Sequence, residues 1–447
     1  MKGFVKVFFL YIIICCCTNC STTHDYVTYK EELNNEESLS IREGILSRTA
    51  QKILYFREGH RVAKIELSAP IRIAQAEQEE EWGYFQFPVI GLTEEGYLFV
   101  DWQMNSDSYK AYGTSSVRKY TPMVSKDEGK TWRPQDKGYK VYSRNYNARL
   151  KNGAELQIKT PKSKEIQAYS SFPKAVITKG KYSYYYENSL PDDLQGIYLS
   201  YTDNNDITKE IHAHIEDPGL LRESVNGYMP IVWWGNIKQL SDESLVAGVY
   251  PNHYLDQAGN LLPSSVSFYH SKDEGNSWTN IGRIPFVKDG IANVKGDGEF
   301  TEPAFEILKD STFICIMRSG SSSPMYRSFS YDRGKTWTTP SPFTPNGVKP
   351  KLLLLDNGVL ALVSGRPGIQ VRFSLDGTGK KWTEPIDMIS FMNEDGSYTR
   401  DVSCGYPSIL EAGDNSFYLV YSDFTTKNEN QEIRKTIWFR KITINLY

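Results

Sequence analysis

Side chains able to bind an acidic molecule stand at the ends of apolar segments in the second half of the chain. The stretch TEPAFEILKDSTFICIMRSG contains Glu302 near its start and Arg318 near its end, and VSGRPGIQVRF contains Arg366. A guanidinium matches a carboxylate with two parallel hydrogen bonds, so an arginine at a strand end is suited to holding one. The Gly-Arg-Pro-Gly turn around Arg366 fixes its backbone and suits the presentation of one side chain. The residue types favour an anion-binding site for a carboxylate, a uronate or a sulfate.

The elements that must position these side chains are marked by a repeated octapeptide of the form S-x-D-x-G-x-[ST]-W. It occurs as SKDEGKTW at 125–132, SKDEGNSW at 271–278 and SYDRGKTW at 330–337, and a fourth copy, SLDGTGKKW at 374–382, has one extra residue. Each copy follows an apolar or aromatic run, which predicts a β-hairpin with the motif at its turn. There the Asp accepts backbone N–H bonds, the Gly supplies positive φ and the Trp folds back over the hairpin. The motif therefore predicts a structural staple without chemistry of its own.

The spacing of the motifs indicates a repeated all-β unit of roughly 45 to 75 residues. YLSYTDNND around Asp203 reads as a degenerate copy within the long first gap. Segments such as PSILEAGDNSFYLVYSD show an apolar strand, a polar turn and a second apolar strand, and helical periodicity is weak throughout. Four antiparallel strands per unit of this length is typical of a β-propeller blade.

The octapeptide resembles the Asp box of the sialidase-like (neuraminidase) BNR-repeat β-propellers, and the resemblance covers about Phe85 to the C-terminus. It implies six blades around a pocket, in which three arginines hold a substrate carboxylate while a Tyr and Glu pair and an Asp perform the chemistry. Asp boxes also occur in propellers that are not enzymes, so function must come from other residues.

The resemblance implies a role for each candidate in the second half of the chain. Glu302 and Arg318 take the places of the family's Glu and second arginine, and Arg366 takes that of the third, Arg372 being the poorer choice. Tyr406 in SCGYPSILE takes the place of the nucleophile. A neutral phenol avoids the repulsion that a carboxylate nucleophile would meet at a sugar with an acid on its anomeric carbon. Because a phenol is weakly nucleophilic at its ordinary pKa of about 10, Glu302 would act as the base that removes its proton.

The N-terminal part of the match departs from the family. YFQFPVIGLTEEGYLFVDW resembles the first strand pair, but Gln86 stands where the family has an arginine. Losing one charged hydrogen bond weakens the hold on a carboxylate by about ten- to a hundredfold. The acid/base Asp of the family lies on the following loop, where Asp107 in QMNSDSYKAYG is the best match and Asp101 the alternative.

Three functions follow from these candidates. The first is an exported glycoside hydrolase of the exo-α-sialidase type that releases an acidic sugar from glycans. The second is a propeller hydrolase or lyase that acts on a uronate or a sulfated glycan. The third is a glycan-binding lipoprotein without catalysis. In each case the expected partner is an acidic glycan.

The first 20 residues have the features of an export signal. MKGFVK supplies positive charge and VFFLYIII a short apolar run, and ICCCTNCSTT resembles a bacterial lipidation site with Cys17 or Cys20 as the modified residue. We expect export to the periplasm, outer membrane or cell surface, with membrane attachment only through a lipid. Residues 21–70 are expected to form a linker and lead-in strand, and 71–447 the propeller domain.

Composition excludes several other classes. A formal net charge of -3 and a pI near 6.2 provide no basic field for a nucleic acid. Outside the signal segment only Cys315 and Cys404 remain, both in apolar runs, so no disulfide framework is expected. The six His residues are scattered, which predicts neither a metal site nor a cofactor, and we expect a monomer.

Overall fold

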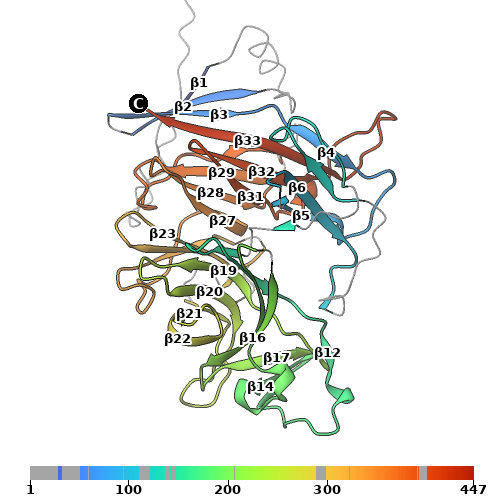
Figure 1. Cartoon of the computed structure of the whole chain (residues 1–447), viewed down its shortest axis with the longest axis vertical. Helices are drawn as coiled ribbons and strands as arrows, with labels where there is room; N and C mark the ends of the chain where they lie inside the picture. The colour runs from blue at the N-terminus through green and yellow to red at the C-terminus, as the bar shows by residue number, and fades with distance from the viewer. Residues whose placement is uncertain are drawn as a thin grey trace, which may run out of the picture.

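The structure is a computed structural model and is built almost entirely of β-strands (Figure 1). It describes residues 29–32, 51–58, 60–93, 95–109, 121–135, 141–142, 147–205, 207–287, 298–321, 323–389, 391 and 400–447. Helical geometry within these ranges is limited to short 3-10 turns. The all-β expectation is confirmed. The expected signal and lipidation segment, 1–20, lies outside the described residues.

Two antiparallel sheets of four strands follow each other along the chain; the first contains Glu302 and Arg318, and Arg366 directly follows a strand of the second. Their strands are β23 (Thr301–Ile307), β24 (Phe313–Arg318), β25 (Tyr326–Ser330) and β26 (Ser341–Pro342), then β27 (Val348–Leu354), β28 (Leu360–Gly365), β29 (Ile369–Ser374) and β30 (Ile386–Asp387). Every residue of β28 and β29 is buried, and β29 thereby buries Gln370, Arg372 and Ser374 between its apolar residues.

Two further sets of four strands are joined into one sheet of eight. They are β10 (Asn147–Arg149), β11 (Glu155–Lys159), β15 (Ile197–Thr202) and β16 (Thr208–Glu216), and β19 (Trp234–Gln239), β20 (Leu245–Asn252), β21 (Ser265–Ser271) and β22 (Ser277–Ile284). The junction is a parallel pairing of β16 with β22. Ile211, Ala213 and Ile215 alternate with exposed polar residues along β16, as expected for a strand with one buried face.

Strands between residues 84 and 142 form a sheet of five in which β5 lies between β6 and β9. Its strands are β5 (Tyr84–Thr93), β6 (Leu98–Met104), β7 (Met123–Ser125), β8 (Arg133–Pro134) and β9 (Val141–Tyr142). β5 pairs with β6 on one side and with the short β9 on the other.

Strands from both ends of the described chain share one sheet. β33 (Thr436–Leu446) pairs with β32 (Ser416–Asp423), which pairs with β31 (Ser408–Gly413), and on its other side β33 pairs with β3 (Arg61–Leu67) and β4 (Ile71–Gln75). β2 (Lys52–Glu58) and β1 (Tyr29–Glu32) extend this sheet outward, so the segment expected as a linker and lead-in strand contributes three strands.

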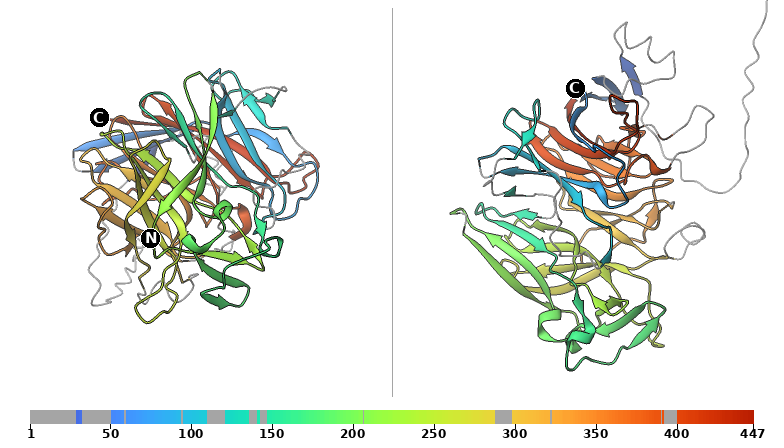
Figure 2. Two further views of the ribbon diagram at one scale, coloured as in Figure 1. Left: turned by 60° about the horizontal axis from the view of Figure 1, so that its bottom comes forward. Right: turned by 90° about the vertical axis from the view of Figure 1, so that its right-hand side faces the viewer.

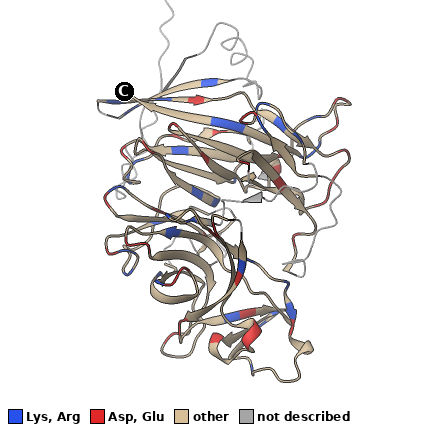
Figure 3. Ribbon diagram, viewed as in Figure 1, with Lys and Arg blue, Asp and Glu red and all other residues tan. Residues whose placement is uncertain are grey.

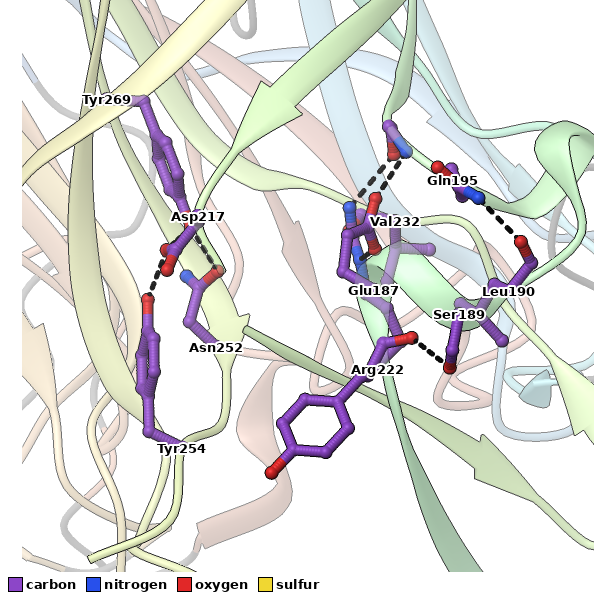
Figure 4. A network of polar contacts seen from close by, with 12 residues as sticks. Glu187, Ser189, Leu190, Gln195, Asp217, Arg222, Val232, Asn252, Tyr254 and Tyr269 are labelled. Carbon is purple, nitrogen blue, oxygen red and sulfur yellow. Dashed lines mark hydrogen bonds and ion pairs between the residues drawn. The ribbon is translucent and has the colours of Figure 1, made fainter. Parts of the chain in front are cut away.

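A smaller sheet lies at the opposite end of the molecule from β1 (Figures 1 and 2). It contains β12 (Lys164–Glu165), β13 (Ile177–Lys179), β14 (Tyr182–Tyr186), β17 (Leu221–Val225) and β18 (Tyr228–Met229), inserted between strands of the eight-stranded sheet. The buried Arg222 of β17 pairs with Glu187, and Arg222 Nη2 donates to the Gly196 carbonyl at 2.9 Å (Figure 4). The repeat spacing did not predict this sheet.

Each repeated octapeptide lies between two consecutive antiparallel strands. In the copy at 330–337, Asp332 accepts hydrogen bonds from the backbone N–H of Thr336 at 2.8 Å and from its hydroxyl at 2.6 Å. Trp337 Nε1 donates to the Gly334 carbonyl at 3.0 Å, and Gly334 has φ 88°. The same three kinds of contact occur at Asp127 and Asp273. The copy with one extra residue keeps the Trp382 bond to the Gly379 carbonyl.

Apolar clusters fill the space between adjacent sheets. One, for example, packs β24 and β25 residues such as Phe313 and Tyr326 against Phe268 of β21. Lys and Arg are interspersed with Asp and Glu along the strands (Figure 3). Within the described ranges, no helix is long and apolar enough to cross a membrane.

Candidate active site

Strands of four sheets have an X-Pro pair at or near their start, and residues of these pairs contact one another. The pairs are Phe87-Pro88 in β5, Glu302-Pro303 in β23, Lys349-Pro350 in β27 and Tyr406-Pro407 just before β31. Because Pro lacks an N–H, it interrupts the ladder, and the register shifts at this point in β5, β23 and β27. In each set of about four strands, the strand that comes first in the chain contacts that of the next set, in the order β10, β19, β23, β27, β31 and β5. The bulged strand starts therefore surround a common point.

Tyr406 is at the centre of this arrangement. Its hydroxyl donates to Glu302 Oε1 and accepts a hydrogen bond from Arg318 Nη1 at 3.2 Å. Arg318 Nη1 also lies 3.0 Å from Glu302 Oε1, so the phenol, the carboxylate and the guanidinium all contact one another. The Tyr406 ring packs edge-on against Phe87, with 5.0 Å between the ring centroids.

A single hydroxyl links the two candidate arginines. Ser321 Oγ accepts from Arg318 Nη2 at 2.8 Å and from Arg366 Nη1 at 3.0 Å. Arg318 stands at the end of β24 and Arg366 directly follows β28, so the two guanidiniums come from neighbouring sheets. Two cations that converge on one oxygen form a favourable place for an anionic oxygen. Arg372 lies within the buried β29, and none of the contacts with Tyr406 or Ser321 described here involves it.

Two glycines allow the turns that carry Arg366 and Tyr406 to touch. A side chain built at Gly365 would lie 1.9 Å from the Gly405 carbonyl oxygen, and one at Gly405 would lie 3.0 Å from the Arg366 side chain. Gly405 also has φ 77°, a conformation that glycine adopts without strain. The two backbones therefore pack directly on each other, which sets the spacing between the guanidinium and the phenol.

Lys349 is a site residue that the sequence reasoning missed. Its backbone N–H donates to Glu302 Oε2 at 2.8 Å, and its Nζ lies over the Tyr406 ring at 5.5 Å from the centroid. The available signal was the X-Pro pair itself, because VKP opens β27 just as TEP opens β23. Both residues before the proline have positive φ, 49° at Glu302 and 46° at Lys349.

The protonation states follow from burial and charge. Burial acts to raise the pKa of Glu302, but Arg318, Lys349 and the hydrogen bonds from Tyr406 and the Lys349 N–H together hold that pKa below its ordinary value. Burial, followed by the charge of Glu302, raises the pKa of Tyr406 well above its ordinary value. At neutral pH the site therefore holds a phenol hydrogen-bonded to an ionised carboxylate. This arrangement can transfer a proton from the phenol as the phenol oxygen attacks an electrophilic carbon.

Gln86 and Asp107, the two candidates from the N-terminal part of the match, are not among the residues described above as contacting Tyr406. Gln86 precedes Phe87 in β5 and is fully buried, and neither of its amide atoms has a hydrogen-bond partner among the described residues. Asp107 is exposed on the loop after β6 and accepts a hydrogen bond from Trp82 Nε1 at 3.0 Å. Its alternative, Asp101, lies within β6 and bonds to the N–H of Trp102. None of the contacts given for Tyr406, Glu302 or Arg318 involves these three candidates.

A cavity lies next to Glu302, and Tyr406, Arg318 and Arg366 are not among the residues that line it. Its volume is about 540 Å³, and Glu302 and Lys349 line it together with residues of β10, β19, β27 and β31. Within the described ranges, no group of three or more His, Cys, Asp or Glu side chains is placed to hold a metal ion. Cys315 and Cys404 are buried free thiols.

The comparisons with known proteins agree with this architecture. Residues 221–419 match the family model of the BNR repeat-like domain. A structure described as a protein of unknown function from Dyadobacter fermentans DSM 18053 is similar, with a TM-score of 0.54 and 16% identity over 84% of this chain and 99% of that one.

Two enzymes are among the other similar structures. An α-L-arabinanase of Penicillium chrysogenum complexed with arabinobiose has a TM-score of 0.45 and 16% identity over 83% of this chain and 97% of its own. The NanB sialidase of Streptococcus pneumoniae has a TM-score of 0.40 and 14% identity over 84% of this chain and 71% of its own. A search of curated proteins found no match. The segment that matches the BNR repeat-like domain, 221–419, contains Glu302, Arg318, Arg366 and Tyr406.

Proposed function

We propose that the protein is a glycoside hydrolase of the exo-α-sialidase type, which releases an acidic sugar from the end of a glycan. Tyr406 is the nucleophile, Glu302 is its base and Asp107 is the acid/base. The observation that carries the proposal is the contact of the Tyr406 hydroxyl with both Glu302 and Arg318. A phenol that merely filled space would not require a buried carboxylate and a guanidinium at the same oxygen.

The reaction takes place in two steps with balanced proton transfers. The Tyr406 oxygen attacks the anomeric carbon while its proton passes to Glu302, and the leaving oxygen of the glycosidic bond takes a proton from Asp107. Water then attacks the covalent glycosyl intermediate, Asp107 takes the proton of the water, and Glu302 returns its proton to the departing phenol. The two inversions retain the anomeric configuration.

The position of Arg318 argues for the substrate class. Its guanidinium contacts both the Tyr406 hydroxyl and the Ser321 hydroxyl, and Arg366 also donates a hydrogen bond to the Ser321 hydroxyl. An anionic group held by these two arginines would therefore lie close to the reacting carbon. A carboxylate on the anomeric carbon itself, as in the sialic acids, meets this condition better than a carboxylate on the far side of a sugar ring.

The test is hydrolysis of an aryl α-sialoside by the wild type and by Glu302→Gln, with thermal melting as a control for folding. We expect turnover by the wild type and a loss of roughly a hundredfold or more in the variant, because the phenol would lack its base. The absence of turnover in the folded wild-type protein, under conditions in which it binds a sialic acid analogue, would contradict the hydrolase proposal.

One observation favours a second function. The neutral, enclosed Gln86 stands where the family resemblance implies an arginine, so the anion-binding group has been changed. Glutamine at this position is compatible with a hydrolase or lyase that acts on a uronate or a sulfated glycan. It is also compatible with a non-catalytic glycan-binding protein. Release of unsaturated or free sugars from uronic or sulfated glycans, with none from sialosides, would favour the enzyme of the second kind.

We further infer that the sheets are arranged as the six blades of a propeller. Five sets of four strands and the set built around β31, β32 and β33 would supply them, with the contacts between first strands as support. The octapeptides would then be Asp boxes at the outer hairpins. Small-angle scattering that requires an elongated solenoid would contradict the arrangement.

For location, we propose export and lipid attachment through Cys17 or Cys20, with the mature protein a monomer without a cofactor. The support is the sequence of residues 1–20. Detergent partitioning of the wild type beside Cys17→Ser and Cys20→Ser tests the attachment. A protein that stays in the aqueous phase in all three forms would contradict it.

A further inference from the structure

Trp82 is an exposed aromatic side chain that is nevertheless held in one orientation. Of the nine Trp residues, all of which lie in the described ranges, it is the only exposed one, with 46% of its surface accessible. Its Nε1 donates to Asp107 Oδ2 at 3.0 Å, and its ring packs edge-on against Phe424, with 6.3 Å between the ring centroids. A ring fixed in this way loses little conformational entropy when a ligand stacks on it.

The backbone around Trp82 holds it beside the Asp107 loop. Lys435 Nζ donates to the first and last carbonyls of the turn at 81–84, at 2.6 and 3.1 Å. Gly83 of this turn has φ 98°, and a side chain built on it would lie 2.5 Å from the backbone nitrogen of Asp107. The turn and the loop therefore pack directly on each other, which keeps the indole and the carboxylate together as a pair.

This pair has the chemistry to bind a sugar. The flat face of an indole packs on the C–H face of a pyranose ring, and a carboxylate accepts hydrogen bonds from hydroxyls. Under the proposed function, Asp107 gives a proton to the leaving oxygen of the glycosidic bond, so that oxygen must come within hydrogen-bonding distance of the Asp107 carboxyl group. Trp82 Nε1 lies 3.0 Å from Oδ2 of the same group, so the sugar bonded to the leaving oxygen would reach the indole.

From these contacts we propose that Trp82 is the platform for the leaving-group sugar, the residue of the glycan from which the acidic sugar is released. The proposal rests on the proposed function and adds to it a preference for substrates whose leaving group is itself a sugar ring. Trp82 then determines specificity for the leaving group, whereas Arg318 and Arg366 hold the acidic sugar.

Two other roles for Trp82 need no contact with a sugar. It could cover the ring of Phe424, for which any apolar side chain of sufficient bulk would serve. It could orient Asp107, for which only the indole N–H is needed. Either role would change the hydrolysis of every substrate by a similar factor, so a comparison of two leaving groups separates both roles from a platform.

The experiment measures kcat/KM for sialyl-lactose, whose leaving group is a sugar, and for methyl α-sialoside, whose leaving group has no ring. The proteins are the wild type, Trp82→Phe, Trp82→Leu and the control Tyr331→Leu, with thermal melting as a check of folding. Both Trp82 variants lack the N–H bond to Asp107, but phenylalanine keeps a flat ring whereas leucine keeps only apolar bulk. The control removes another exposed ring, because Tyr331 is 66% exposed in the turn of an octapeptide.

We expect the wild type to prefer sialyl-lactose and Trp82→Leu to lose that preference by about three- to tenfold, the range for one aromatic contact. Trp82→Phe should keep most of the preference, and Tyr331→Leu should keep all of it. If the wild type hydrolyses both substrates equally, or if Trp82→Leu keeps the wild-type ratio, the inference is wrong while the proposed function stands. An equal loss of preference in Trp82→Phe would assign the effect to the N–H and would also overturn the inference. If the folded wild type hydrolyses neither substrate, the proposed function is wrong and the inference with it.

Discussion

Replacement of Tyr406 by Phe removes one oxygen atom from the centre of the candidate site. That oxygen donates to Glu302 and accepts from Arg318 at 3.2 Å. The ring of the new side chain would keep its packing against Phe87 and under the Lys349 ammonium. The substitution therefore tests the chemistry of the hydroxyl with little change in shape.

The expected effects on stability and on turnover differ greatly in size. Each hydrogen bond to a charged partner contributes about 1.5 to 3 kcal/mol. Glu302 retains Arg318 at 3.0 Å and the Lys349 N–H at 2.8 Å, so we expect the free energy of unfolding to fall by only about 1 to 3 kcal/mol. Turnover should fall by roughly a thousandfold or more, because the nucleophile is lost. Affinity for a ground-state analogue should stay within about threefold.

The assay combines hydrolysis of an aryl α-sialoside, calorimetric binding of a sialic acid analogue and thermal melting. The matched control is Tyr269→Phe, which removes a buried hydroxyl from outside the site. Tyr269 donates to Asp217 Oδ2 at 2.8 Å, in the cluster with Asn252 and Tyr254 that Figure 4 shows. We expect this control to lose stability by a similar amount and to keep its turnover.

Two results would refute the reasoning. Hydrolysis that survives Tyr406→Phe unchanged would exclude the phenol as nucleophile. A loss of turnover of equal size in Tyr269→Phe would show that the assay reports general destabilisation and not the chemistry of Tyr406.

Four other expectations concern particular groups. Hydrolysis should decline on the acid side only below about pH 4.5, because the pKa of Glu302 is held below its ordinary 4.5. The stability that this carboxylate provides should be present above that pH and be lost as the pH falls through the lowered pKa. A decline of the rate that begins above pH 5 would contradict this. Asp332→Ala should lower the free energy of unfolding by about 1 to 3 kcal/mol without a change in substrate preference, as measured by denaturant melts and kinetics. Arg222→Met should cost about 3 to 5 kcal/mol because Glu187 is left buried and unpaired, and the double variant with Glu187→Leu should recover much of it; no recovery would argue against a pairwise effect. Gln86→Arg should strengthen binding of a sialic acid analogue if the substrate is a sialoside, and should weaken both binding and stability if the site has been rebuilt for another acidic sugar, as calorimetry and melting will tell.

Local sequence signals were sufficient to predict the all-β class and the turns at the octapeptides. The octapeptide contains its own hydrogen-bonding partners, so Asp332, Thr336 and Gly334 form the turn from adjacent positions. The resemblance also selected Glu302, Arg318, Arg366 and Tyr406, and the structure brings these four together although they lie on three sheets and the adjoining turns. Their catalytic roles stay predictions.

Features that depend on contacts between distant segments were not predicted. Lys349 enters the site because β27 packs beside β23, and the X-Pro pair in VKP marks a strand start without revealing that packing. The packing of Gly365 against Gly405 joins two turns that are far apart in sequence. The smaller sheet is assembled from two separate insertions, so its strands have no common period with the octapeptides.

The pairing of β33 with β3 has a consequence for the order of folding. The backbone N–H of Lys441 bonds to the hydroxyl of Ser68 across 373 residues of chain, one of the most distant contacts in the protein. Closing so large a loop costs more conformational entropy than closing any hairpin. Favourable contacts offset this cost only when β33 pairs with its neighbours. The sheet shared by the two ends should therefore be the slowest part to form, and until it forms the edges of β32 and β3 are open to pairing with other chains. During synthesis the chain would therefore lack this sheet until β33 is available, and a chaperone that shields strand edges should improve the yield of refolding.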